Sequence, residues 1–176
     1  MSNFNYDNIP SELKRYKNWV CWTVDKIPKN PHTGGNAMSN NKSTWGTFAQ
    51  AEAACSQYGF DGVGFMFTPP YFGVDMDHCL EDTDKVDEFV DTLGSYSEYS
   101  RSGTGIHIIC KGELPAGARR RGNVEMYDSG RFFIMTGRIY GDLRPIAECS
   151  ETIKILHNKY LAEAQSTALP KRYEKV

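Results

Sequence analysis

An apolar run ends in a pair of aspartates at residues 71–77, which read YFGVDMD. Residues two apart on a strand point to the same face of a sheet. Asp75 and Asp77 are therefore expected to project side by side, while Met76 turns the other way into the core. Two carboxylates held that close repel each other and cost stability unless a cation or a hydrogen-bond donor lies between them.

The composition is that of a globular domain. The 176 residues are 40% hydrophobic and 12% aromatic, enough to build a core. The net charge of −2 gives no general attraction to nucleic acid or membranes, so a polyanion site must come from local clustering. No apolar run could span a bilayer and the first residues lack a signal-peptide core, so we expect a cytoplasmic protein without membrane partners. The five scattered cysteines, with no Cys-x-x-Cys pair, argue against a disulfide framework or a zinc ribbon.

Apolar patterns and turn residues predict a mixed order of helices and strands. Strands are expected at 19–24, 62–67 and 71–77, with the last two joined as a hairpin by a Pro-Pro turn. Further strand candidates are SEYSRS, GIHIICKG, GNVEMYDSG and RFFIMTG. Helices are expected in IPSELKRYKNW and at 47–59, 82–94 and 145–165, and a long loop at 25–44. This order indicates an α+β fold rather than a doubly wound sheet.

Polar residues stand at strand positions that should be apolar. His107 interrupts an isoleucine-rich strand, and Glu125 lies within the apolar run NVEMY. Arg131 and Arg138 bracket the strand FFIMTG. Each feature also has an ordinary explanation. The aspartates could end a solvated edge, His107 could be a satisfied core histidine, Glu125 could lie on a solvated face, and SGTG could be a plain turn.

Together these residues favour nucleotidyl transfer. The three carboxylates of Asp75, Asp77 and Glu125 suit hard divalent cations such as Mg²⁺ or Mn²⁺. Two such ions can activate an attacking hydroxyl and stabilise a leaving pyrophosphate. Backbone N–H groups of the SGTG turn, together with His107 and the arginines, offer donors for a polyphosphate.

Two basic segments are further candidates for phosphate binding. The densest positive cluster is ARRRG, with Arg119, Arg120 and Arg121. It either contacts template or primer phosphates or is a loop that aids solubility. Lys26 and Lys29, in the long loop, either reach the triphosphate or the template or face solvent.

The order GVDMDHC, SRSGTGIHI and VEMYDSGRFFIMTGR resembles the three motifs of the archaeo-eukaryotic primase superfamily. More narrowly, it resembles the primase-polymerase domain at the N-terminus of phage and plasmid replication proteins. The preceding segment VCWTVDKIPKNPHTGGNAMSNNKSTWGTFAQA is similar to the same family, so the resemblance runs from about residue 19 to about residue 146. One motif departs, because the superfamily often has Ser-x-His whereas Gly105 stands two before His107. Ser102 or a backbone N–H of the turn is expected to replace that serine.

The resemblance implies roles for the motif residues. Asp75, Asp77 and Glu125 would bind two Mg²⁺ or Mn²⁺ ions and carry catalysis. His107 would contact the triphosphate. The full set expected at the nucleotide is His107, Ser102, Gly103, Gly105, Arg131, Arg138 and Lys29. The implied fold is an RRM-like catalytic β-sheet with flanking helices, packed against a smaller N-terminal α/β unit, with the active site between them.

We expect a single domain over residues 1–165, followed by a polar tail or linker at 166–176. Within the domain, an N-terminal α/β unit would cover about residues 1–60 and the catalytic core about residues 61–165. The tail suggests that the chain belongs to a longer protein.

The resemblance implies a template-dependent DNA primase and polymerase of a phage or mobile element. It would transfer nucleotides from nucleoside triphosphates to a primer 3′-hydroxyl on single-stranded DNA, with a helicase domain or another replication protein as partner. One alternative is a nucleotide- and nucleic-acid-binding domain that has lost catalysis. Another is a nucleotide-sugar glycosyltransferase that uses the Asp-x-Asp pair.

Overall fold

The computed structural model describes residues 4–162, which fold into strands and helices that alternate along the chain. The strands are β1 (Trp19–Trp22), β2 (Pro28–Lys29), β3 (Gly62–Met66), β4 (Tyr71–Met76), β5 (Tyr96–Tyr99), β6 (Ile106–Lys111), β7 (Arg120–Arg121), β8 (Val124–Tyr127) and β9 (Phe132–Ile134). The helices are α1 (Ser11–Lys14), α2 (Phe48–Tyr58), α3 (Thr83–Leu93) and α4 (Thr152–Tyr160), with short 3-10 helices η1 (Tyr6–Asn8) and η2 (Lys42–Thr44). The tail expected at 166–176 lies outside the described residues.

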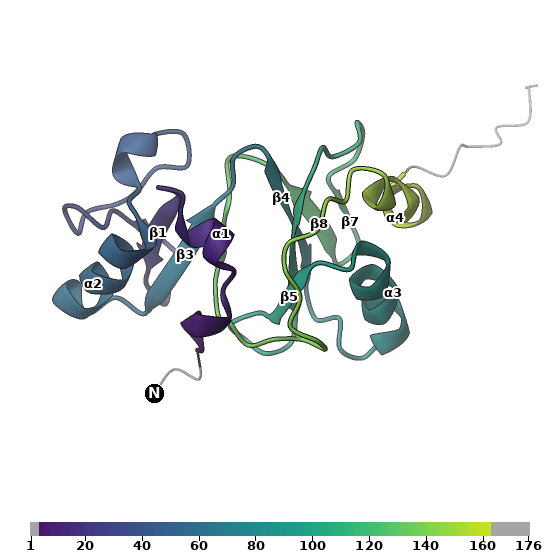
Figure 1. The fold of residues 1–176 in the computed structure, drawn as a ribbon, viewed down its shortest axis with the longest axis horizontal. Coiled ribbons are helices and arrows are strands. Elements are labelled where there is room, and N and C mark those ends of the chain that lie inside the picture. Colours follow the sequence, from purple (N-terminus) through teal and green to yellow (C-terminus); the bar gives the residue numbers. More distant parts are fainter. Residues whose placement is uncertain (1–3, 163–176) are drawn as a thin grey trace, which may run out of the picture.

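The strands form two antiparallel sheets, and in Figure 1 the sheet with β1 and β3 lies on the left beside α2, while the sheet with β4, β5 and β8 lies between it and helices α3 and α4. One sheet has four strands in the order β2-β1-β3-β9, and the other has five in the order β5-β6-β4-β8-β7. The α+β class expected from the sequence is confirmed. The four-stranded sheet takes β9 from late in the chain, so the sheets do not divide the sequence at residue 60.

Helices α2 and α3 begin and end at the capping signals in the sequence. The Thr47 side chain accepts from the Gln50 backbone N–H, and the Gln50 side chain accepts from the Thr47 N–H, which makes a capping box for α2. Helix α3 begins after Asp82, whose side chain accepts from a backbone N–H of the first turn. The helices end at Gly59 (φ 69°) and Gly94 (φ 57°), left-handed positions that favour glycine.

The hairpin expected from residues 62–77 does not form. Strand β3 lies between β1 and β9, whereas β4 lies between β6 and β8 in the other sheet. The Pro-Pro segment therefore carries the chain from one sheet to the other. The physical reason is burial, because Val63 and Phe65 pack into one apolar cluster and Phe72 and Val74 into another. A hairpin would hold both pairs in one sheet, and two separate sheets bury each pair in its own core.

The closing helix is shorter than the expected 145–165. Helix α4 begins only at Thr152, and the segment before it is extended beside the end of β6. Lys111 N–H donates to the Ala147 carbonyl (2.9 Å), and Cys149 N–H donates to the Lys111 carbonyl (2.8 Å). These bonds satisfy the backbone groups at the end of β6, and the Cys149 side chain is buried. Backbone pairing with β6 therefore overrides the helical pattern of residues 145–151.

The two faces of the five-stranded sheet differ in chemistry. Phe72, Val74 and Met76 of β4 point to one face and pack with residues of α3 and α4 into a single apolar cluster. Figure 1 shows both helices on that side, away from the four-stranded sheet. The intervening positions Gly73 and Asp75 point to the other face. The expected inward turn of Met76, which is fully buried, is confirmed.

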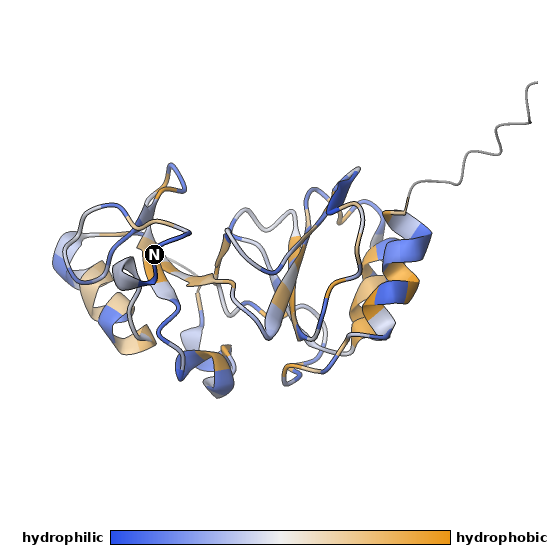
Figure 2. Ribbon diagram, turned by 90° about the horizontal axis from the view of Figure 1, so that it is seen from above, coloured by the Kyte–Doolittle hydropathy of each residue, from blue (hydrophilic) through white to orange (hydrophobic). Residues whose placement is uncertain are grey.

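Figure 2 shows apolar residues along the strands and hydrophilic residues on the loops and the outer sides of the helices. Within residues 4–162, no helix has the length and apolar character needed to cross a membrane. All five cysteines of this part of the chain are free thiols, and four of them are buried, as expected for small core residues.

Phe89 on α3 is fully buried against the five-stranded sheet. We expect Phe89→Ala to lower the free energy of unfolding by about 3–5 kcal/mol, because it leaves a cavity between helix and sheet. Ile155→Ala on α4 is the control, since Ile155 is 61% exposed, and it should change stability by less than about 0.5 kcal/mol. Urea unfolding followed by circular dichroism measures both, and equal losses would contradict this packing.

Candidate active site

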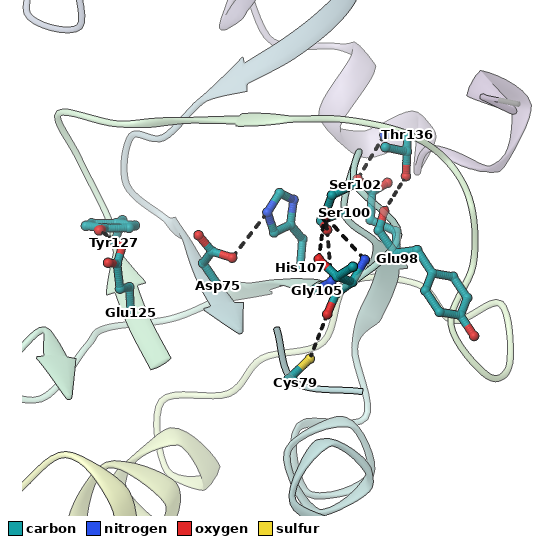
Figure 3. Close-up of polar contacts among 12 residues, drawn as sticks. Asp75, Cys79, Glu98, Ser100, Ser102, Gly105, His107, Glu125, Tyr127 and Thr136 are labelled. Atoms are coloured by element: carbon teal, nitrogen blue, oxygen red, sulfur yellow. Dashed lines mark hydrogen bonds and ion pairs between the residues drawn. The ribbon is translucent and has the colours of Figure 1, made fainter. Parts of the chain in front are cut away.

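Five charged or titratable side chains lie in one line across the five-stranded sheet. From β7 to β5, successive cross-strand partners are Arg120, Glu125, Asp75, His107 and Glu98. Residues directly opposite each other in an antiparallel sheet project on the same face. The register therefore brings residues from all three sequence motifs together, and we call this set the polar row. Figure 3 shows Glu125, Asp75 and His107 side by side on adjacent strands.

The middle of the polar row faces a pocket of about 890 Å³ between the two sheets. The five-stranded sheet contributes Asp75, His107, Glu125 and Tyr127 to its lining. The opposite side is built from the long loop and the β9 region, with Lys26, Pro28, Ala37, Ser39 and residues 130–134. The candidate site therefore lies between the two sheets.

Asp75 and His107 form the centre of the row. His107 Nε2 lies 3.4 Å from Asp75 Oδ1, an ion-pair contact rather than a hydrogen bond. Burial lowers the pKa of His107, but the carboxylates of Asp75 and Glu98 outweigh it and leave the pKa raised. The two carboxylates thus stabilise the protonated form of His107 relative to the neutral form.

The His107 ring is held in place by stacking. It lies on Phe133 of β9 with 4.2 Å between ring centroids and 19° between planes. Phe133 fits there because Gly73, two residues before Asp75, has no side chain, and a β-carbon at Gly73 would overlap the Phe133 ring. The glycine of the YFGVDMD run therefore sets the orientation of the histidine.

Glu125 is engaged at both carboxylate oxygens. Arg120 Nε lies 3.1 Å from Glu125 Oε1, and the Tyr127 hydroxyl donates to Oε2. Burial and the adjacent carboxylate raise the pKa of Tyr127 to about 12. The guanidinium of Arg131, for which a phosphate contact is a prediction, lies over the Tyr127 ring at 4.7 Å and lines the pocket.

Asp77 lies just beyond β4, exposed, on the pocket wall. The glycine-rich turn lies beside it, and Ser102 of that turn also lines the pocket. Gly105 packs against the end of β4 so closely that a β-carbon would lie 2.7 Å from the Met76 carbonyl oxygen. Gly103 has a φ of 76°, which favours glycine. Within the described chain, the two glycines shape the turn without lining the pocket.

Arg138 lies behind the turn rather than in the pocket lining of the described chain. Its guanidinium donates to the carbonyls of Ser100 and Arg101, the latter at 2.8 Å, and lies 5.6 Å from the Phe4 ring centroid. Arg138 therefore holds the backbone of the glycine-rich turn in place. Lys29 donates to Asn36 Oδ1 (2.8 Å) and is also outside the lining.

Within the ARRRG cluster, only one arginine joins the polar row. Arg119 donates to the Pro115 carbonyl (2.6 Å) and Arg121 to the Ala162 carbonyl (2.8 Å). Arg120 instead reaches Glu125. The three consecutive arginines thus have different partners, although nothing in the sequence distinguishes one from another.

Glu98 was missed by the sequence analysis. It is fully buried, and its carboxylate accepts from the Thr136 N–H (2.9 Å), the Gly137 N–H (2.8 Å) and the Tyr96 hydroxyl (2.6 Å). Burial raises the pKa of Glu98, while His107 and the three donors act against that rise. An acid within the strand SEYSRS is the same signal that singled out Glu125, and it could have identified Glu98.

Arg101 is a second residue that the sequence analysis missed. It lines the pocket, donates to the Val24 carbonyl (3.3 Å) and lies over the Trp22 ring at 5.0 Å. It therefore connects the glycine-rich turn to the four-stranded sheet. No pattern in the sequence distinguishes Arg101 from any other turn arginine.

The carboxylates have the donor chemistry for a divalent cation. Asp75 and Glu125 are direct cross-strand neighbours, and Asp75 Oδ1 is a buried atom without a hydrogen-bond partner among the described residues. Oxygen donors suit Mg²⁺ or Mn²⁺. Within residues 4–162, no three His, Cys, Asp or Glu side chains converge closely enough to hold a metal ion. Asp75, Asp77 and Glu125 therefore supply oxygen donors of the right kind on one pocket wall, without forming a closed set of three ligands in the described residues.

Comparison with known proteins gives one informative match. The sequence is 32% identical over 157 residues to the "DNA Primase-polymerase" of Nitratiruptor phage NrS-1. The match covers 80% of this chain and 22% of the phage protein, so the chain spans about a fifth of the length of that relative. No family model matches the sequence.

We expect Glu98→Gln to destabilise the fold by about 1–3 kcal/mol, because an amide NH₂ would face one of three buried donors and leave it unsatisfied. Thermal unfolding measures the loss. Glu151→Gln is the matched control, since the Glu151 side chain is 85% exposed, and it should shift stability by less than about 0.5 kcal/mol. A Glu98→Gln protein as stable as wild type would show that these hydrogen bonds contribute nothing.

Proposed function

Because this chain carries a domain of the primase-polymerase family, we propose that it is a template-dependent nucleotidyltransferase that makes or extends DNA primers in the replication of a phage or mobile element. The observation that carries the proposal is the polar row. Its residues Asp75, His107 and Glu125 come from three separate motifs and line one pocket. Single-stranded template, primer and nucleoside triphosphates would be its ligands.

We assign Asp75, Asp77 and Glu125 as the ligands of two Mg²⁺ or Mn²⁺ ions. Bound there, such ions supply a polarised hydroxyl nucleophile and neutralise charge on a leaving pyrophosphate. The assignment is supported by the buried Asp75 oxygen that lacks a hydrogen-bond partner within residues 4–162, and by the repulsion between neighbouring carboxylates that a cation would offset.

The chain's own residues would position the nucleotide. His107, stacked on Phe133, would hold the triphosphate from the floor of the pocket. Arg131 and the Ser102 hydroxyl would contact it from the sides. In the reaction, the primer 3′-hydroxyl would lose its proton to water, its oxygen would bond to the α-phosphorus in line with the leaving group, and the bond between the α-phosphorus and the bridging oxygen would break to release pyrophosphate.

The fold supports a division of labour between the sheets. We propose that the five-stranded sheet with α3 and α4 is the RRM-like catalytic sheet. The four-stranded sheet with α2 would be the N-terminal α/β unit that closes the pocket through Lys26 and its loop. A helicase domain or a separate replication protein would act with it in the cytoplasm.

A second candidate is a nucleotide- and nucleic-acid-binding domain without catalysis. The observation that favours it is that, within the described residues, no three candidate ligands converge on one point. Primer extension separates the two candidates.

We expect extension of a labelled primer on a single-stranded template with Mg²⁺ or Mn²⁺. Asp75→Ala and Glu125→Ala should each lower the rate more than ~100-fold, since loss of even an outer-shell partner of a metal site costs up to that much. Asp142→Ala is the control, because Asp142 is exposed and lies outside the pocket lining in residues 4–162.

The outcomes distinguish the candidates. Extension that survives in Asp75→Ala would overturn the metal assignment. Nucleotide binding without extension by wild type would favour the binding domain. Absence of both would contradict the proposed function.

A further inference from the structure

Arg120, at the exposed end of the polar row, is a cation held against a carboxylate that the proposed function assigns to metal. Its Nε lies 3.1 Å from Glu125 Oε1, with the Arg120 side chain 74% exposed and that of Glu125 18% exposed. The contact follows from the register of β7 on β8, which places the two residues directly opposite each other. Arg120 thus occupies one of the two oxygens that a metal ion would use.

The neighbouring arginines show that Arg120 is placed differently from the rest of its cluster. Arg119 and Arg121 each donate to a backbone carbonyl, and Arg121 ties the β7–β8 hairpin to the end of α4 through Ala162. Within residues 4–162, the side-chain partner of Arg120 is Glu125 alone. The hairpin is therefore anchored by its flanking arginines, while Arg120 can swing without disturbing it.

The ion pair between Arg120 and Glu125 is weak enough for a divalent cation to displace Arg120. The ion pair contributes little stability, because solvent and salt screen the largely exposed Arg120 guanidinium. That is enough to offset part of the repulsion between Glu125 and Asp75 when metal is absent. It is too little to compete with a divalent cation, which interacts with both carboxylates at once.

A guanidinium released from Glu125 can bind phosphate, the anion that the proposed function brings to this site. It presents donors in a planar fork that matches phosphate oxygens. Displaced from Glu125, it would remain at the edge of the site that, in the proposed function, receives a nucleoside triphosphate together with metal.

We propose that Arg120 is a displaceable counter-ion. It neutralises Glu125 in the metal-free protein, leaves when a divalent cation binds, and then contacts the phosphates of the incoming nucleoside triphosphate. This inference rests on the proposed function and deepens it, because it makes metal binding the step that frees a nucleotide contact.

The first test is Mn²⁺ binding without nucleotide, measured by titration calorimetry on wild type, Arg120→Ala and Arg121→Ala. Arg121→Ala removes the same charge from the same hairpin and controls for the general electrostatic field. We expect Arg120→Ala to bind Mn²⁺ ~2–5-fold more tightly than Arg121→Ala, because the competing ion pair is gone.

The second test is binding of a deoxynucleoside triphosphate in the presence of Ca²⁺, on the same three proteins. Here Arg120→Ala should bind about 10-fold more weakly than wild type, because a charge-assisted hydrogen bond to phosphate is lost. One substitution therefore strengthens metal binding and weakens nucleotide binding. A bystander surface ion pair would not produce these opposite effects.

Equal Mn²⁺ affinities for Arg120→Ala and Arg121→Ala, or unchanged nucleotide binding by Arg120→Ala, would overturn the counter-ion role. The proposed function would still stand if Asp75→Ala abolishes Mn²⁺ binding. If neither wild type nor Arg120→Ala binds Mn²⁺, the metal assignment and the counter-ion role both fail. Thermal unfolding of each variant checks that the fold is intact.

Discussion

The pairing register of β4 with its two neighbours is the constraint on which the rest of the site depends. It aligns Asp75 with His107 on one side and with Glu125 on the other. Because side chains alternate along a strand, a slip of one residue would move this set into the apolar core beneath α3 and α4. Burial of Val74 and Met76 on the opposite face therefore holds the catalytic candidates toward the pocket.

The alignment also explains how this chain tolerates closely spaced acids. Along the polar row, acids are flanked by cationic groups, with Arg120 beside Glu125 and His107 between Asp75 and Glu98. At the buried end, the backbone N–H groups of Thr136 and Gly137 donate hydrogen bonds to the Glu98 carboxylate. At the exposed end, Glu125 forms a weak ion pair with Arg120. The row is thus fully hydrogen-bonded at its buried end and solvent-exposed at the Arg120 end.

Part of this arrangement was predictable. Capping residues at Thr47 and Asp82 and glycine stops predicted α2 and α3, since these signals act within a few residues. Acids and a histidine inside apolar strands singled out Asp75, Glu125 and His107. The same rule, applied to SEYSRS, would have included Glu98. Conversely, the predicted hairpin at 62–77 was wrong, because turn residues do not determine which distant strands pair with the two strands that they join.

Residue type and short-range spacing are sufficient to predict the α+β class, helices α2 and α3 and the residues of the three motifs. Which strands are neighbours depends instead on long-range packing, which only the fold reveals. It thereby set apart the partners of three consecutive arginines, placed Arg138 behind the turn and brought Phe133 onto His107. These are contacts between segments far apart in the chain, and the burial of two separate apolar clusters selects them.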